Sequence, residues 1–258
     1  MTRRRKLYIS SYGPMEKPIK QGFVWLWDTA VRENTLGAYL AVPTLQNLDG
    51  VVADCLGNEF VKELKRDKRM MVSHEGASLT FDLLTERIDT SSSYQGPALV
   101  MYPNARLLEK MDDDDRVTDV LVVPWIMADI EEWIQIWRAQ QLGMEGEQLR
   151  EPEFSDPVVE AALKTLTIRV NLSTGIAHPS DRDLAVWVFL RLNLARILYD
   201  PVEIKGWLVR HGWKSRHADA VKEVATKIQS GKRVRINSRR EMLVDNIVEI
   251  WRESALKS

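Results

Sequence analysis

Two apolar runs, GPALVMYP at residues 96–103 and TDVLVVPW at residues 118–125, decide the fold that this sequence predicts. Short runs of this kind, with few polar residues and a proline at the end, are typical of strands buried on both faces of a sheet. Between the runs, apolar residues recur at helical spacing: Ala105, Leu107, Leu108 and Met111. We therefore expect a strand, a helix and a second strand joined by a right-handed crossover, in a sheet that is at least partly parallel.

The flanking sequence extends this unit into an α/β domain. Upstream, the patterns predict strands at residues 6–11, 22–27 and 36–42, one amphipathic helix at 49–65, and a hairpin of strands at 69–73 and 79–84. Residues 85–95 are polar and predict a loop, and the apolar stripe in residues 126–141 predicts a helix. The expected fold of residues 1–143 is a Rossmann-like domain, with a mixed, partly parallel sheet and flanking helices.

The second half of the chain predicts an all-α domain. Residues 144–156 contain Gly146, Pro152 and several glutamates, and we expect a linker there and a helical domain at 157–258. Polar residues mark the expected starts of its helices: Asp156, Ser180, Asp200, Ser215, and Ser238 with Glu241 as a capping box before a last helix at 241–255.

Composition limits the classes of function. The 258 residues include 37 acidic and 36 basic side chains, so no overall charge selects a nucleic acid or a membrane. The single cysteine, Cys55, excludes an intrachain disulfide and a cysteine zinc site, which suits a reducing cytoplasm. No run approaches the roughly 20 apolar residues of a membrane-spanning helix. We expect a cytoplasmic protein with no membrane association, no metal and no cofactor.

The expected strand ends form the first candidate site. Four apolar runs finish at a proline: Pro14, Pro43, Pro103 and Pro124. If these strands are parallel, their ends share one edge, where ligands of open α/β sheets bind. The polar and aromatic residues there suit a nucleotide or another anion: Ser10, Ser11, Tyr12, Thr44, Asn47, Asn104, Arg106 and Trp125. The sequence lacks both the glycine-rich dinucleotide motif and the P-loop. The alternative is that the prolines only end strands and start helices.

A second candidate site consists of acid and base residues in the first domain. Asp54, His74 and Asp82 are the candidate catalytic groups, with Arg106 as an anion clamp. The alternative is that His74 at a hairpin tip and the acidic run 112–115 are solvated loops. No nucleophile elbow, paired cysteine motif or zinc-binding histidine spacing occurs, so the sequence leans away from an enzyme.

The C-terminal segment is the strongest candidate site. Residues 200–258 contain thirteen lysines and arginines against eight acids, a net charge of +5. Residues 201–210, a turn at 211–213 and residues 215–230 have the layout of a helix-turn-helix pair. The residues expected to contact nucleic acid are Lys214, Arg216, His217, Lys222, Lys227, Lys232, Arg233, Arg235, Arg239 and Arg240. The alternative is an ordinary helical domain whose basic residues favour helix ends.

These observations favour a non-catalytic binding or regulatory protein. In this hypothesis the helical domain contacts nucleic acid, and the α/β domain binds a small anionic ligand or a protein partner. One alternative is an enzyme that acts on a nucleotide or phosphate-bearing substrate at the strand ends. Another is a protein-protein interaction subunit of a larger complex, which the tryptophans in residues 126–141 and at Trp207, Trp213 and Trp251 suggest.

Overall fold

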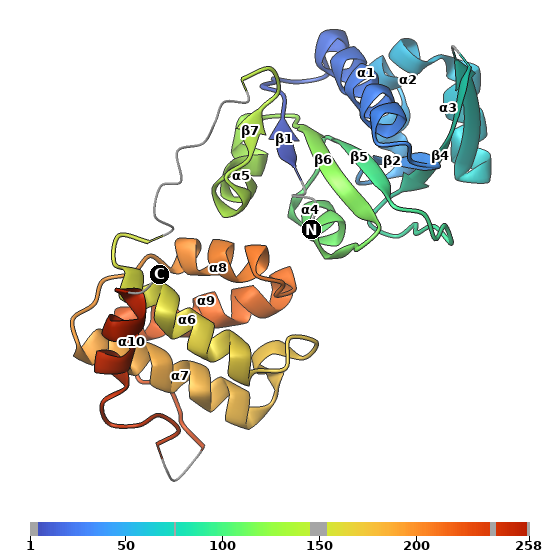
Figure 1. The fold of residues 1–258 in the computed structure, drawn as a ribbon. Helices are drawn as coiled ribbons and strands as arrows, with labels where there is room; N and C mark the ends of the chain where they lie inside the picture. The colour runs from blue at the N-terminus through green and yellow to red at the C-terminus, as the bar shows by residue number, and fades with distance from the viewer. Residues whose placement is uncertain (1–4, 75, 145–153, 238–240, 257–258) are drawn as a thin grey trace. The chain divides into compact units, whose positions relative to one another are not determined.

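The structure is a computed structural model that describes residues 5–74, 76–144, 154–237 and 241–256. The chain divides into two compact units, Met1–Gly146 and Glu147–Ser258, and each is described by itself (Figure 1). The first, the α/β unit, contains a mixed sheet with flanking helices. The regular elements described in the second, the helical unit, are all helices. No helix among the described residues is long and apolar enough to span a membrane.

The α/β unit is built on a seven-stranded sheet with the order β3-β4-β2-β5-β6-β1-β7. The strands are β1 (Lys6–Tyr8), β2 (Gly37–Ala41), β3 (Arg69–His74), β4 (Ala77–Leu84), β5 (Gly96–Met101), β6 (Val117–Val123) and β7 (Gln140–Gln141). All neighbouring strands are parallel except β3 and β4, which form the expected antiparallel hairpin. The mixed, largely parallel sheet that the sequence predicts is therefore confirmed.

The unit that residues 96–125 predict is present. Strands β5 and β6 pair in parallel, with Val100 opposite Val122, and α4 (Ala105–Asp113) connects them. Asn104 caps this helix, since its side-chain oxygen accepts a hydrogen bond from the Leu107 backbone N–H at 3.1 Å. The apolar residues Leu107, Leu108 and Met111 are buried against the sheet, as their spacing predicts.

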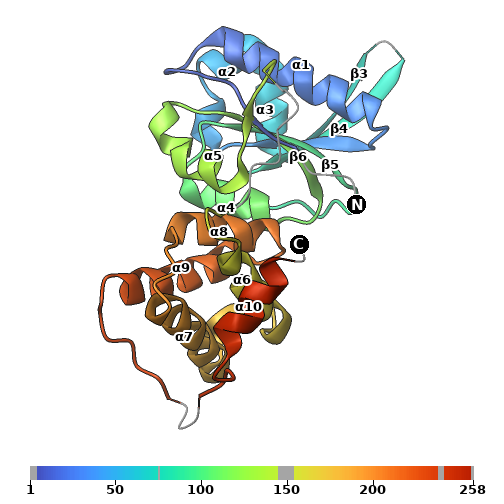
Figure 2. The same ribbon diagram turned by 60° about the vertical axis from the view of Figure 1, so that its left-hand side comes forward.

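Helices cover both faces of the sheet (Figures 1 and 2). They are α1 (Glu16–Arg32), α2 (Val51–Leu56) and α3 (Asn58–Asp67) on one face, and α4 and α5 (Glu131–Trp137) on the other. Successive strand residues point to opposite faces. Leu40 and Leu99 therefore pack beneath α1–α3, whereas Tyr39 and Val100 pack beneath α4 and α5. The result is a three-layer arrangement with two apolar cores.

Residues 22–27 are not the strand that their composition predicts, because they lie inside α1. The buried positions of this helix, which include Ile19, Gly22, Leu26 and Ala30, recur at helical spacing. The aromatic residues between them remain partly exposed, so the run reads as apolar throughout and hides the helical period. Gly22 allows α1 to approach β5, since a Cβ there would lie 2.7 Å from Leu99 Cδ1.

Two further helix predictions are wrong in extent. The single helix expected at 49–65 is split into α2 and α3 at Gly57, whose φ of +94° no helix can continue. The helix expected at 126–141 is a 3₁₀ turn, η2 (Met127–Ile130), followed by α5. The chain then turns at Arg138, with a φ of +50°, and adds β7 to the sheet edge. The spacing of apolar residues does not predict the backbone turns at Gly57 and Arg138.

The helical unit contains α6 (Pro157–Arg169), η3 (Gly175–Ala177), α7 (Pro179–Leu194), α8 (Pro201–Arg210), α9 (Ser215–Gln229) and α10 (Ile247–Ala255). Helix α9 packs against α8 and α7, and α10 packs against α6. Trp207 and Trp251, each 1% exposed, are among the largest buried side chains of the core.

The helix starts agree with the sequence at Asp156 and Asp200, whose carboxylates cap α6 and α8. Helix α7 begins one residue before Ser180, and His178 occupies its N-cap. The last helix begins at Ile247 rather than at Glu241, because Glu241 pairs with Arg191 of α7 instead of capping a helix. The expected cap Ser238 lies outside the described residues.

Candidate functional site

The ends of the parallel strands meet at one edge of the sheet. Strands β2, β5, β6 and β1 are consecutive neighbours and run in the same direction. Their carboxyl ends, with the prolines that follow them, therefore lie along one edge, which we call the strand-end rim. The first step of the sequence argument for this site is thus correct.

A crevice lies where β1 and β6 end side by side. Strand β1 leads into α1 on one face of the sheet, and β6 leads through η2 into α5 on the other. Connections that leave neighbouring strands toward opposite faces create the position where open α/β sheets bind ligands. A hollow of about 640 Å³ opens here, lined by Ser10, Ser11, Tyr12, Met15, Ile126, Met127 and Ala128.

The wall of this hollow combines hydroxyls and aromatic rings. Ser10 is exposed, and Ser11 is buried with its Oγ 3.5 Å from the Gly13 carbonyl oxygen. The Tyr12 side chain is 81% exposed and Trp125 is 45% exposed. The Gly13 N–H donates to the Trp125 carbonyl oxygen at 2.6 Å and so ties the two strand ends together.

Tyr102 ends β5 in an unusual conformation. Its φ of +52° is rare for an aromatic residue. It places the side chain in the core beneath α1–α3, although strand alternation alone would point it to the opposite face. The ring meets the Trp125 ring edge-on, with 5.2 Å between centroids. The buried hydroxyl has no hydrogen-bond partner among the described residues. Burial, with a smaller effect of Cys55, raises the pKa of Tyr102 to about 12.

Only some of the residues that the sequence assigns to the rim line the hollow. Ser10, Ser11 and Tyr12 line the hollow, and Trp125 precedes its lining residue Ile126. Thr44 and Asn47 instead form a capping box for the 3₁₀ turn η1 (Leu45–Leu48). Asn104 caps α4 and donates from Nδ2 to Glu86 Oε1 at 2.5 Å. Arg106 is exposed on the first turn of α4 and does not line the hollow.

Four lining residues were missed by sequence reasoning. Met15, Ile126, Met127 and Ala128 follow the predicted strand ends in the sequence, and this position is the only signal that could have found them. The sequence predicted only that a strand ends at Tyr102, because no sequence pattern indicates the left-handed backbone conformation of this residue.

The candidate catalytic residues are not brought together. Asp54 is exposed on α2, on one face of the sheet. Asp82 packs with Tyr39 and Tyr94 on the other face. His74 ends β3 at the opposite edge from the strand-end rim, where its ring lies 5.8 Å from that of Trp27. These three residues therefore cannot act on one substrate in this arrangement.

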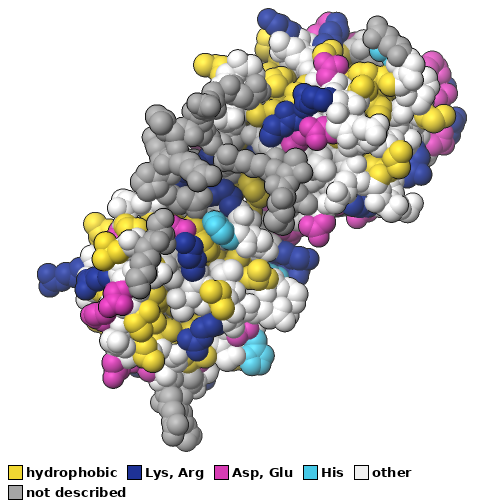
Figure 3. Space-filling model, viewed as in Figure 1, with side chains coloured by type: hydrophobic (Ala, Val, Ile, Leu, Met, Phe, Trp, Pro, Cys, Tyr) yellow, Lys and Arg dark blue, Asp and Glu magenta, His cyan; other side chains and the backbone are white. Residues whose placement is uncertain are grey.

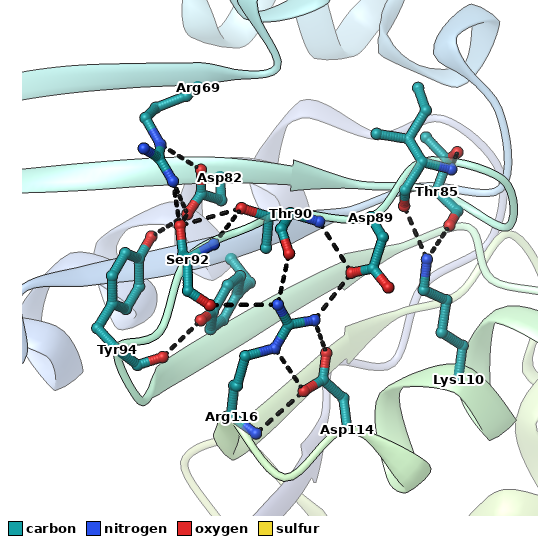
Figure 4. Close-up of polar contacts among 12 residues, drawn as sticks. Arg69, Asp82, Thr85, Asp89, Thr90, Ser92, Tyr94, Lys110, Asp114 and Arg116 are labelled. Atoms are coloured by element: carbon teal, nitrogen blue, oxygen red, sulfur yellow. Dashed lines mark hydrogen bonds and ion pairs between the residues drawn. The ribbon is translucent and has the colours of Figure 1, made fainter.

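Asp82 has a structural role (Figure 4). Its side chain is 1% exposed and accepts hydrogen bonds from Arg69 Nε at 2.7 Å, from Tyr94 OH at 2.6 Å and from Ser92 Oγ. Burial raises the pKa of Asp82, but the hydrogen bonds from these three partners outweigh it, so the pKa is lowered. The ionised carboxylate anchors the loop at residues 85–95 to the sheet.

The acidic run at 112–115 is not simply a solvated loop. The Asp112 side chain is 7% exposed and accepts from Lys6 Nζ at 2.9 Å and from Trp137 Nε1 at 2.8 Å. The Asp114 side chain is 9% exposed and pairs with Arg116 at 2.7 Å, and Arg116 in turn donates to the Thr90 carbonyl oxygen (Figure 4). Both acids stabilise the fold. Among the described residues, no group of three or more histidine, cysteine or acidic side chains is placed to hold a metal ion.

The residues predicted to contact nucleic acid lie in different environments. Lys214 and Arg216 are exposed at the start of α9. His217 packs instead against the turn before α7, with Nδ1 3.3 Å from the Leu172 carbonyl oxygen. Lys222 is half-buried, and Lys227 pairs with Glu223.

Beyond α9, residues 231–237 form an exposed connection that we call the basic segment. It carries Lys232, Arg233 and Arg235 on its surface. Arg239 and Arg240 lie outside the described residues. On the face seen in Figure 3, basic and acidic side chains are interspersed over the helical unit, with no extended patch of one sign.

The tryptophans that suggested a protein interface belong to the cores. Trp133, Trp207, Trp213 and Trp251 are each at most 5% exposed. These four therefore contribute packing rather than an exposed apolar surface, whereas Trp137 of α5 is partly exposed.

The comparisons with known proteins concern the helical unit. A family model described as a domain of unknown function, DUF1889, matches residues 155–252. This match runs from just before α6 into α10 and leaves the α/β unit uncovered. The comparison with curated proteins found no match, and the comparison with solved structures found none either. The residues and their geometry therefore carry the functional argument.

Proposed function

We propose that the α/β unit is a Rossmann-like binding module that takes a small ligand at the crevice between β1 and β6. The hollow at this crevice is the observation that carries the proposal, because it lies where neighbouring strands send their connections to opposite faces.

The lining suggests the chemical class of the ligand. Tyr12 offers an exposed ring that suits a planar base, and Ser10 offers a hydroxyl for a sugar or phosphate oxygen. Trp125, which is 45% exposed, directly precedes the lining residue Ile126. Met15 and Met127 supply apolar, adaptable contacts. A nucleoside or nucleotide combines a planar base with such polar groups.

Binding fits this lining better than turnover. Within the part of the chain that the structure describes, the lining residues include no carboxylate and no histidine, which are the groups most often used for proton transfer. Asp54, His74 and Asp82, which an enzyme acting on a phosphate-bearing substrate was expected to use, lie elsewhere. The proposal is therefore a ligand-binding, regulatory module.

Calorimetric titration of the full chain with nucleosides and with nucleoside mono-, di- and triphosphates tests this proposal. The variant Tyr12→Ala should weaken binding at least several-fold and leave stability unchanged, because this side chain is 81% exposed. The matched control is Leu36→Ala, which removes a 76% exposed side chain before β2, at the start rather than the end of a strand. No binding by any compound, or equal binding by both variants, would refute the proposal.

The second candidate function is contact between the helical unit and nucleic acid. The observation that favours it is the pair α8 and α9, joined by a turn in which Gly212 has a φ of +89°, with Lys214 and Arg216 exposed where the second helix begins. This layout resembles a helix-turn-helix pair. Binding to a mixed-sequence duplex and a single strand over a salt series tests it, and affinity that does not fall with salt would contradict it.

A further inference from the structure

Among the described residues predicted to contact nucleic acid, the exposed basic ones fall into two groups, one at each end of α9. Lys214 and Arg216 lie at its start, and the basic segment follows its end. The helix has 15 residues, which corresponds to about 22 Å at the usual rise per residue. The two groups are therefore separate candidate surfaces, although they read as one cluster in the sequence.

The side of α9 that bears charges is electrically mixed. Asp219 pairs with the buried Lys205 of α8 at 2.8 Å, and Glu223 pairs with Lys227. Acids placed along a helix oppose its approach to phosphates. Helix α9 is thus a weak candidate for insertion into a DNA groove.

The basic segment has a different character. Its side chains alternate, with Arg233 and Arg235 exposed and Val234 and Ile236 half-buried. Among the described residues, no carboxylate forms an ion pair with Lys232, Arg233 or Arg235. The basic side chains are thus presented to solvent, and the apolar side chains beside them are partly covered.

The segment is also fastened in place. The Asn237 N–H donates to both carboxylate oxygens of Asp183, at 2.9 and 3.1 Å, and Asp183 is 1% exposed in α7. Arg182 donates to the Arg235 carbonyl oxygen at 3.0 Å. An ordered segment loses less conformational entropy when it binds a partner, so this fastening favours a binding surface.

We propose that the basic segment is a surface that binds the phosphate backbone of nucleic acid without reading its sequence. This inference rests on the second candidate function and moves its main contact from α9 to residues 231–237. Guanidinium groups pair well with phosphate oxygens, and Arg233 and Arg235, which are both exposed and two residues apart, suit contacts to successive phosphates. A membrane surface fits less well, because the apolar residues of the segment, Val234 and Ile236, are half-buried rather than exposed for insertion.

Fluorescence anisotropy of labelled single-stranded and duplex DNA of the same mixed sequence, titrated with the full chain over a salt series, tests the inference. The double variant Arg233→Ala with Arg235→Ala removes two charges of the segment. Its matched control, Lys214→Ala with Arg216→Ala, removes two exposed charges at the start of α9. The variant Asp183→Asn keeps every basic residue and weakens the fastening of the segment.

We expect the segment variant to lower affinity at low salt by about tenfold and to reduce the slope of log affinity against log salt by about 2. The control should lower affinity by less than the segment variant does, because the basic segment makes the main contact. Asp183→Asn should weaken binding and speed hydrogen exchange at the Asn237 amide. Circular dichroism must show that all three variants stay folded.

The outcomes separate this inference from the function on which it rests. If the α9 control variant loses binding while the segment variant binds normally, the inference about the basic segment is overturned. The proposal that the helical unit contacts nucleic acid then still stands. If the wild-type chain binds no nucleic acid at low salt, both are overturned. Binding to phosphatidylserine vesicles without binding to DNA would also overturn the inference.

Discussion

At the residue scale, Tyr102 combines two features that are each uncommon in a protein core. Its left-handed backbone is strained for an aromatic residue, and its buried hydroxyl lacks a hydrogen-bond partner among the described residues. Strain of this kind often accumulates at functional sites, and Tyr102 lies at the strand-end rim beside Trp125. The residue links the fold of β5 to the proposed binding region.

The variant Tyr102→Phe removes this hydroxyl and keeps the ring. We expect the free energy of unfolding to stay the same or to rise by about 1 kcal/mol, because a buried polar group without a partner is costly. Urea denaturation of the purified chain measures the change. A loss of more than about 1 kcal/mol would mean that the hydroxyl has a partner in solution.

Asp82 illustrates the opposite case, a buried charge with several partners. Asp82→Asn should lower the free energy of unfolding by about 2 to 3 kcal/mol, since hydrogen bonds to an ionised group are stronger than neutral ones. Asp89→Asn is the matched control, because this carboxylate is 64% exposed and its pair with Arg116 contributes at most about 1 kcal/mol. Equal effects of the two changes would contradict the structural role of Asp82.

The lowered pKa of Asp82 also predicts a dependence on pH. A carboxylate with a lower pKa in the folded state than in the unfolded state, where it is about 3.9, stabilises the fold above that value. This contribution is lost as the pH falls through the lower, folded value. Below about pH 4, the wild-type chain should therefore lose more stability than Asp82→Asn. Denaturant midpoints at a series of acid pH values measure this difference, and parallel curves would contradict it.

At the scale of elements, the sequence correctly predicted the strands and helices whose local sequence pattern agrees with how they pack. Strand β5 is an apolar run, β6 ends in the apolar run at residues 120–123, and Asn104 marks the start of the helix between them. Helix α1 was missed because residues 22–27 are apolar on every side, and only contact with the sheet distinguishes its buried from its exposed positions. The break at Gly57 was missed because a single glycine also occurs within helices.

Close approach of strands β2 and β5 gives a prediction at this scale. A Cβ at Gly96 would lie 2.2 Å from the backbone carbonyl oxygen of Gly37, which cannot move without distorting β2. Gly96→Ala should lower the free energy of unfolding by about 2 to 3 kcal/mol through this overlap. Chemical denaturation measures the loss. A neutral effect would show that the two strands are further apart in solution.

At the scale of the whole molecule, the sequence predicted an α/β part and a helical part but only half of the candidate site. The residues Ser10, Ser11 and Tyr12 were found because they follow a strand directly. The division between lining and capping residues depended on strand order and on which face each connection covers. Neither property is encoded locally, so Thr44 and Asn104 were assigned to the ligand although they cap helices.

The basic residues show the same limit in the helical unit. Sequence distance grouped Lys214 with Arg235, whereas the 15-residue helix α9 separates their positions. The ion pairs of Asp219 and Glu223 further change the charge that a partner would meet. The distribution of charge over the surface therefore could not be predicted from the sequence without the fold.

The most direct test of the proposed ligand site is a nuclear magnetic resonance titration of the full chain with a nucleoside phosphate. We predict that the backbone amide signals that shift will belong to Ser10–Tyr12, Met15 and residues 125–128, which surround the hollow between β1 and β6. Shifts confined to other parts of the chain, or no shifts at millimolar ligand, would contradict the proposal.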